Sequence, residues 1–173
     1  MSNVRFIADL HFGHKWAAEN RGFSSIEEHN DKIIENWNKI VNKRDLTIVL
    51  GDITMEDRSF IPLMDKLLGK KILIGGNHDI RSDYKILKNY FEAILGCEMY
   101  KGFILTHIPI HPSELEGRFR GNIHGHIHNN IISKPSWSSV TNSPIMVKDT
   151  NYINVSCEQI NLTPVSLKEL GFS

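Results

Sequence analysis

The chain has 173 residues, of which 40% are hydrophobic and 23% are charged, and its 20 basic residues balance its 20 acidic ones. This length predicts a single domain over residues 1–173. The sequence contains no apolar run of the roughly 18 residues that a membrane-spanning helix needs. A formal net charge of zero disfavours proteins that bind long duplex DNA, whose phosphates require a basic surface. We therefore expect a small substrate and no membrane partner.

The N-terminal segment runs directly into a strand-like stretch, without the basic start, apolar middle and cleavage site of a secretory signal. We therefore expect the protein in the cytoplasm. The two cysteines, Cys97 and Cys157, lie far apart and form no Cys-x-x-Cys pair. Both are predicted to be reduced and to bind no metal.

Three strands are predicted in the first half of the chain, and polar side chains follow each of them. The strands cover residues 4–8, 46–50 and 71–74, and they end at Asp9 with His11, at Asp52, and at Asn77 with His78 and Asp79. Their continuous apolar runs are typical of strands buried on both faces. Helices are predicted over about residues 25–41, 57–68 and 82–90, the first from its capping-box spacing and helical apolar repeat.

This alternation of strands and helices predicts βαβ units and a largely parallel sheet. Parallel sheets carry their sites beyond the C-terminal ends of the strands. The three polar clusters are therefore expected to share one edge of the sheet.

The second half of the chain contains shorter strand-like segments, predicted at residues 91–95, 101–107, 121–127 and 152–157. Their spacing favours hairpins over crossovers, and we expect a second sheet. His107 ends one of these segments, whereas His126 and His128, two positions apart on an extended chain, should point the same way. Residues 129–150 show no clear period and are predicted to form a long irregular loop.

The chemistry of these side chains indicates a metal site without sulfur. Carboxylate, amide and imidazole ligands suit Mn²⁺, our first candidate, and also Zn²⁺, Fe, Ni²⁺ or Co²⁺. Seven candidate ligands are too many for one ion, so we expect two ions about 3.5–4 Å apart, bridged by Asp52. A water shared by two cations ionises near neutral pH and would supply a hydroxide nucleophile. The candidate ligands are Asp9, His11, Asp52, Asn77, His107, His126 and His128.

A leaving alkoxide needs a proton, and His78 is the side chain of its cluster that can donate one near neutral pH. We therefore predict His78 as the general acid. The adjacent Asp79 is predicted to hold the His78 ring and favour its protonated form.

The motifs Asp-x-His, Gly-Asp, Gly-Asn-His-Asp, a strand-end His and Gly-His-x-His occur in this order along the chain. By chance, Gly-His-x-His would occur about 0.03 times and Gly-Asn-His-Asp about 0.003 times in such a sequence. The series resembles the five motifs of the calcineurin-like metallophosphoesterase superfamily, and the chain is most similar to its small bacterial and phage-type members without a cap domain.

This resemblance implies an α/β fold, a four-layer αββα sandwich of two facing mixed sheets, and it implies His78 as proton donor. It also implies two ligand sets that share one carboxylate. One ion would be held by Asp9, His11, Asp52 and His128, and the other by Asp52, Asn77, His107 and His126.

Without a cap domain, substrate choice falls to loops 12–24, 108–121 and 129–150. His14 and Arg21 are predicted to contact a phosphate substrate. His111, Arg118 and Arg120 lie in or near the same loops and are further candidates for contact with a phosphate. We expect a structural role for His124, a core position for Trp37 and a helix-surface position for His29.

The sequence therefore predicts a dinuclear metallophosphoesterase that hydrolyses phosphodiester or phosphomonoester bonds by in-line attack. Small nucleotide-type substrates are favoured. Two alternatives remain open: a nuclease for short or structured nucleic acid, and a metal-binding scaffold that has lost turnover. The intact ligand set disfavours the scaffold.

Overall fold

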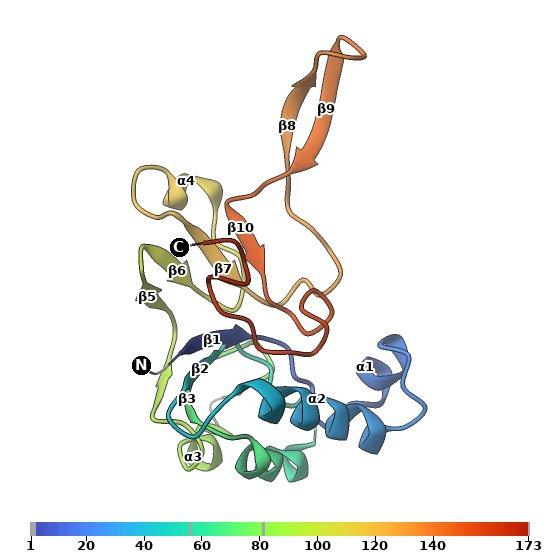
Figure 1. Ribbon diagram of the computed structural model, residues 1–173, viewed down its shortest axis with the longest axis vertical. Coiled ribbons are helices and arrows are strands. Elements are labelled where there is room, and N and C mark those ends of the chain that lie inside the picture. The colour runs from blue at the N-terminus through green and yellow to red at the C-terminus, as the bar shows by residue number, and fades with distance from the viewer. Residues whose placement is uncertain (1–2, 56, 81, 173) are drawn as a thin grey trace.

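Two four-stranded sheets form the body of the protein in the computed structural model, which describes residues 3–55, 57–80 and 82–172 (Figure 1). The first sheet has the order β1-β2-β3-β4, and all its strand pairs are parallel. Its strands are β1 (Val4–Ile7), β2 (Leu46–Val49), β3 (Lys70–Ile74) and β4 (Ala93–Leu95). The predicted parallel sheet is thus confirmed.

The second sheet has the order β10-β7-β6-β5 and is mixed, because β5 is antiparallel to β6 whereas the other pairs are parallel. Its strands are β5 (Glu98–Tyr100), β6 (Phe103–Leu105), β7 (Gly121–His124) and β10 (Tyr152–Asn154). The expected second sheet is confirmed, but the preference for hairpins is wrong for β6, β7 and β10. The chain crosses from β6 to β7 through the short helix α4 (Pro112–Leu115) and from β7 to β10 through residues 125–151, and the spacing of the segments alone did not reveal these crossovers.

Helices cover the outer face of the first sheet (Figure 1). They are α2 (Ile26–Ile40), the 3₁₀ helix η1 (Arg58–Lys66) and α3 (Tyr84–Leu87), while α1 (Lys15–Asn20) lies beside α2. Helix α2 matches its prediction: the Ser25 side chain accepts a hydrogen bond from the Glu28 amide at its N-terminus. Its Trp37 is fully buried in the core, as expected.

The segment predicted as a helix over 57–68 is a 3₁₀ helix. Pro62 lies inside it, and proline has no amide hydrogen to continue an α-helical ladder. Helix α3 has four residues and is shorter than the predicted 82–90.

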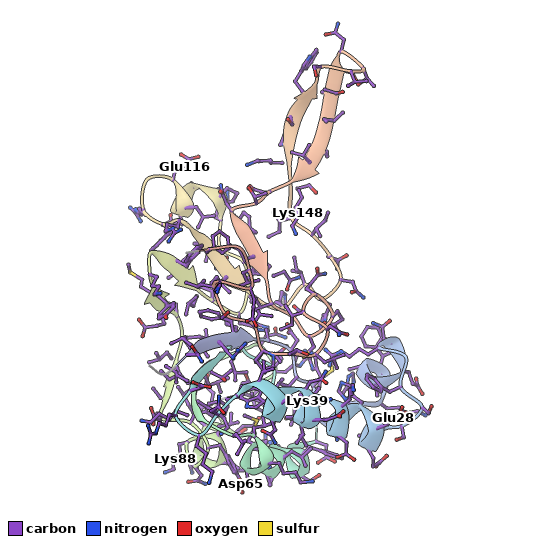
Figure 2. All side chains as sticks on the ribbon, in the orientation of Figure 1. Glu28, Lys39, Asp65, Lys88, Glu116 and Lys148 are labelled. Carbon is purple, nitrogen blue, oxygen red and sulfur yellow. The ribbon has the colours of Figure 1, made fainter. Side chains whose placement is uncertain are left out.

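Apolar side chains from both sheets meet between them and form one core cluster, and Figure 2 shows side chains filling this space. Phe6 of β1 and Leu50, which follows β2, come from the first sheet. Phe103 and Ile123 come from the second. On the far side of the second sheet, the four-residue helix α4 (Pro112–Leu115) packs through Leu115. The αββα order of layers is therefore present, with a thin fourth layer.

The predicted loop 129–150 contains a β-hairpin, so the prediction of an irregular loop is wrong. Strands β8 (Ser133–Ser138) and β9 (Ser143–Lys148) pair antiparallel, and the hairpin projects away from the body (Figure 1). Lys148 marks its base in Figure 2. Because both faces of this ribbon are largely exposed, its sequence carries no alternation of buried and exposed residues that would signal a strand.

None of the described helices has both the length and the apolar character that crossing a membrane requires. Both cysteines are free thiols; Cys157 is buried and Cys97 is exposed.

The prediction that His29 lies on a helix surface is wrong, because this side chain is fully buried. Its Nε2 lies 2.8 Å from the Arg21 guanidinium, its Nδ1 lies 3.3 Å from the Asn30 side-chain oxygen, and the Phe23 ring packs edge-on against it. The loop that leads from α1 into α2 thus covers a position that the helical pattern alone leaves exposed. Burial, reinforced by the Arg21 charge, lowers the His29 pKa to about 4.

This burial predicts that acid destabilises the protein through His29. Below pH 6.5 the unfolded chain binds a proton at His29 that the folded chain does not, so stability falls as the pH drops towards 4. This group should account for a loss of about 2 kcal/mol in the free energy of unfolding between pH 7 and 5. Urea unfolding in EDTA should therefore show a weaker pH dependence for His29→Gln than for the wild type. If the stability of both proteins depends on pH to the same extent, His29 is not the group that destabilises the protein in acid.

Candidate metal centre

The candidate site lies where the C-terminal ends of strands from both sheets meet. Backbone hydrogen bonds from Ala8 to Val155 and from Cys157 to Ala8 join the end of β1 to the chain that follows β10. Side chains that follow β1, β2, β3, β6 and β7 therefore converge there. They include all seven predicted ligands: Asp9, His11, Asp52, Asn77, His107, His126 and His128, together called the ligand cluster below.

The backbone of the ligand cluster is unusual. Nine non-glycine residues in the described part of the chain have positive φ, and five of them belong to the cluster. These five are Asp9 (59°), His11 (48°), Asp52 (59°), His126 (71°) and His128 (50°). Residues other than glycine rarely adopt a positive φ. The exceptions are concentrated at functional sites. The sharp turns after the strands therefore point to a functional arrangement of these side chains.

The glycines of the motifs leave space for the carboxylates. A Cβ atom at Gly76 would collide with the Asp52 carboxylate, and one at Gly125 would lie 2.6 Å from an Asp9 carboxylate oxygen. Gly51 has φ of +87°, and a Cβ there would overlap the His107 ring. The glycines in the Gly-Asp, Gly-Gly-Asn-His-Asp and Gly-His-x-His motifs thus let backbone and ligands approach closely.

The ligand atoms lie close enough to share cations. Donor atoms of Asp9, His11 and His128 all lie within 4.8 Å of one another, and so do those of Asp9, Asp52 and His107. The Asp52 Oδ2 lies 3.9 Å from the His11 Nε2 and 3.4 Å from the His107 Nε2, so it faces both groups.

Asn77 completes the cluster, since its side-chain oxygen lies 2.9 Å from both the His107 Nε2 and the His126 Nδ1.

Hydrogen bonds orient two of the imidazoles. The His107 Nδ1 lies 2.7 Å from the Leu50 carbonyl, which can only accept, so Nδ1 carries the hydrogen and Nε2 faces Asp52. Burial opposes protonation of His107, but the hydrogen bond and the charge of Asp52 outweigh it and raise its pKa to about 9.

His11 provides the test of whether a cation fits. The side chain is buried, and neither ring nitrogen has a hydrogen-bond partner among the described residues. Burial lowers its pKa to about 3, which keeps the ring neutral with a lone pair available. A buried polar atom without a partner is costly, and a divalent cation beside Asp9 and Asp52 would remove that cost. The residues therefore fit a divalent cation.

Arg21 does not occupy the predicted substrate-contacting position, because its side chain is only 2% exposed. It makes four hydrogen bonds: to the carbonyl oxygens of Asp9 and Leu10, to the His29 ring and, through Nε, to Glu158, with which it also forms an ion pair. The sequence showed a cation in a loop but not these partners. Arg21 thus supports the turn that carries Asp9.

Glu158 is a residue of the site that the sequence analysis missed. Its Oε1 lies 3.0 Å from the His128 Nδ1 and 2.8 Å from the Arg21 guanidinium. Burial raises the pKa of this carboxyl, but the His128 hydrogen bond and the Arg21 charge overcome that effect and lower it to about 2. The ionised carboxylate orients the His128 ring so that Nε2 is left for a metal. Its one sequence signal is an acidic residue directly after the last predicted strand.

Asp79 does not hold the His78 ring as predicted. Its two carboxylate oxygens instead accept hydrogen bonds from three backbone amides, those of Asp52, Ile53 and Gly76. A buried carboxylate next to these amides satisfies them, and it fixes the loops after β2 and β3 to each other. Asp79 is therefore a positioning residue for Asp52.

His78 itself borders the ligand cluster. Its amide donates to the Asp52 Oδ1 over 3.0 Å, and its half-buried ring lies 5.9 Å from the His11 ring, centroid to centroid. This position is compatible with the predicted proton donor.

The remaining predicted residues lie in different surroundings. The His14 ring lies 5.9 Å from the His11 ring. Arg118 pairs with Glu114 on the surface, and the Arg120 guanidinium lies over the Phe103 ring. The His111 side chain caps helix α4.

His124 is buried, and its Nδ1 lies 2.8 Å from the Gly125 carbonyl oxygen, in accordance with a structural role.

Comparison with known proteins gives the family. The model of the calcineurin-like phosphoesterase family matches residues 2–126. An uncharacterized protein of Methanocaldococcus jannaschii is 34% identical, over 96% of this chain and 88% of its own length. The gene 66 protein of Mycobacterium phage D29 is 31% identical, over 76% of this chain and 81% of its own. The chain therefore belongs to the calcineurin-like phosphoesterase family.

A solved structure supports the fold. A protein of unknown function from Aquifex aeolicus superposes with a TM-score of 0.71 at 24% sequence identity, over 99% of this chain and 98% of the other. The arrangement of two facing sheets is therefore shared with an experimentally determined structure.

Proposed function

We propose that this protein is a metal-dependent phosphoesterase that uses two divalent cations, with Mn²⁺ as the first candidate, to hydrolyse phosphodiester or phosphomonoester bonds. Small nucleotide-type esters are the favoured substrates. The observation that carries the proposal is the ligand cluster, whose seven side chains come from five strand ends and include the unpartnered ring nitrogens of His11. Family membership supports the same reaction class.

When bound, a pair of cations lowers the pKa of a shared water and neutralises charge on the phosphate. The protein contributes the geometry. Asp52 faces both halves of the cluster, and Asp79 fixes its backbone. His107 and His128 each have one ring nitrogen hydrogen-bonded to the protein and thus direct the other towards the cluster.

The direct test is hydrolysis of bis-p-nitrophenyl phosphate and p-nitrophenyl phosphate by purified protein, with each candidate metal added after EDTA treatment. Turnover that needs a divalent cation is the expected result. If no metal supports hydrolysis of either ester, the proposal is wrong and a metal-binding scaffold becomes the better account.

His78 is the proposed proton donor to the leaving oxygen. Replacing it with alanine should lower kcat by about 10²- to 10⁴-fold for an alkyl phosphate ester, while the metal content stays the same. The loss should be smaller for p-nitrophenyl esters, because p-nitrophenolate leaves without needing a proton.

The matched control for this prediction is His111→Ala, since His111 caps a surface helix. A His78→Ala variant with the same loss of kcat on both kinds of ester would contradict the role of proton donor.

A further inference from the structure

A cavity of about 440 Å³ lies next to the ligand cluster, at the start of α1. Its volume lies within the usual range for small-molecule sites, about 300–1,000 Å³. Six of the residues that line it are Phe12, His14, Trp16, Glu19, Met55 and Asp57. His14 lines the cavity and lies near both the metal site and Trp16: its ring is 5.9 Å from the His11 ring and 6.4 Å from the Trp16 ring, centroid to centroid.

Trp16 lines this cavity without belonging to the core. Its side chain is 59% exposed, whereas the next two residues of α1, Ala17 and Ala18, are buried and anchor the helix. The fold therefore does not need an indole at this position for packing. An exposed indole at the edge of a cavity offers a flat apolar face on which another ring can stack.

The charges of the cavity restrict what can bind. Glu19 and Asp57 contribute two carboxylates, and hydrogen bonds from Ser59 lower the Asp57 pKa, which keeps it ionised. Lys15 lies 3.7 Å from Glu19 and offsets part of this charge. Carboxylates accept hydrogen bonds from amino groups and repel phosphates. An uncharged ring that carries N–H groups therefore fits better than a second phosphate.

We propose that this cavity is the subsite for the nucleobase of a nucleotide-type phosphate ester, with the base stacked on Trp16 and the ester phosphorus at the ligand cluster. This inference rests on the proposed function for the position of the phosphate and for the nucleotide-type substrate, and it adds the site that recognises the base. Trp16 is then the specificity-determining residue, and His14 lies between base and metal site.

The first test compares two esters with the same leaving group, thymidine 5′-(p-nitrophenyl phosphate) and methyl p-nitrophenyl phosphate. Trp16→Ala should lower kcat/KM for the thymidine ester by about 5- to 150-fold, the range for stacking one base on an aromatic side chain, and leave the methyl ester unchanged. The control is Trp137→Ala, since Trp137 is 62% exposed on the β8–β9 hairpin. Equal losses on both esters would place the aryl group in the cavity and overturn the proposal.

The second test does not depend on turnover. In metal-free protein labelled with ¹⁵N, the indole N–H resonance of Trp16 should shift on titration with adenosine, whereas that of Trp137 should stay in place. Equal shifts of both, or none at Trp16, would overturn the subsite. A shift at Trp16 in a protein that hydrolyses no ester would support the subsite and contradict the proposed phosphoesterase activity, so the two failures are distinguishable.

Discussion

Replacing Asp52 with asparagine should remove bound metal and phosphoesterase activity together. The Asp52 Oδ2 lies within 4 Å of imidazole nitrogens on both sides of the ligand cluster, and its Oδ1 accepts a hydrogen bond from the His78 amide. Asparagine keeps the size of the side chain but removes the charge that two cations would share. Hydrolysis should fall to the background rate, because Asp52 is the carboxylate that the proposal assigns to both cations.

Metal content after dialysis, measured per protein chain, checks this prediction alongside hydrolysis of bis-p-nitrophenyl phosphate. Asp65→Asn is the matched control, since Asp65 is an exposed residue of η1 on the surface of the protein (Figure 2). It should retain metal and activity. Equal metal content in the wild type and the Asp52 variant would contradict the assignment of Asp52 as the bridging ligand.

The ligand cluster could be predicted from the sequence because each ligand lies two to four residues past the end of a strand. Parallel strands align their C-terminal ends, so an apolar run followed by Asp or His fixes the place of that side chain in space. The same logic predicted β1, β2 and β3 to within about a residue or two at each end. It could not predict which oxygen or nitrogen faces the metal, because that depends on partners such as the Leu50 carbonyl and the Asn77 amide.

Other features escaped prediction because they depend on contacts between distant segments. Arg21 meets Glu158 and the Asp9 carbonyl only after the chain has folded, so a lone arginine in a loop suggested a substrate contact. His29 is covered by the loop before its own helix. The backbone groups of the β8–β9 hairpin hydrogen-bond to each other, and few of its side chains are buried. Its sequence therefore lacks the alternation of apolar and polar residues from which strands are recognised.

Replacing Glu158 with glutamine should weaken metal binding by about 10- to 100-fold, the usual effect of removing a carboxylate that orients a metal-binding histidine. Glutamine has nearly the same shape but carries no charge, so it neither fixes the His128 ring as firmly nor balances the Arg21 guanidinium. Breaking a buried ion pair by removing one charge also costs about 3–5 kcal/mol of stability. The variant should therefore unfold at a lower urea concentration in EDTA.

Competition with a fluorescent indicator for Mn²⁺ measures the metal affinity of the variant. The measurement is made without urea, after circular dichroism has shown that the variant is folded. Glu169→Gln is the matched control: Glu169 also pairs with an arginine, Arg5, over 2.9 Å, but its side chain is 51% exposed. Because Glu169 is half-exposed and, among the described residues, makes no hydrogen bond to the ligand cluster, this control should keep its metal affinity and lose less stability than Glu158→Gln. If Glu158→Gln loses stability but binds Mn²⁺ as tightly as the wild type, Glu158 supports only the fold, and the orientation of His128 must come from the backbone turn at its positive φ of 50°.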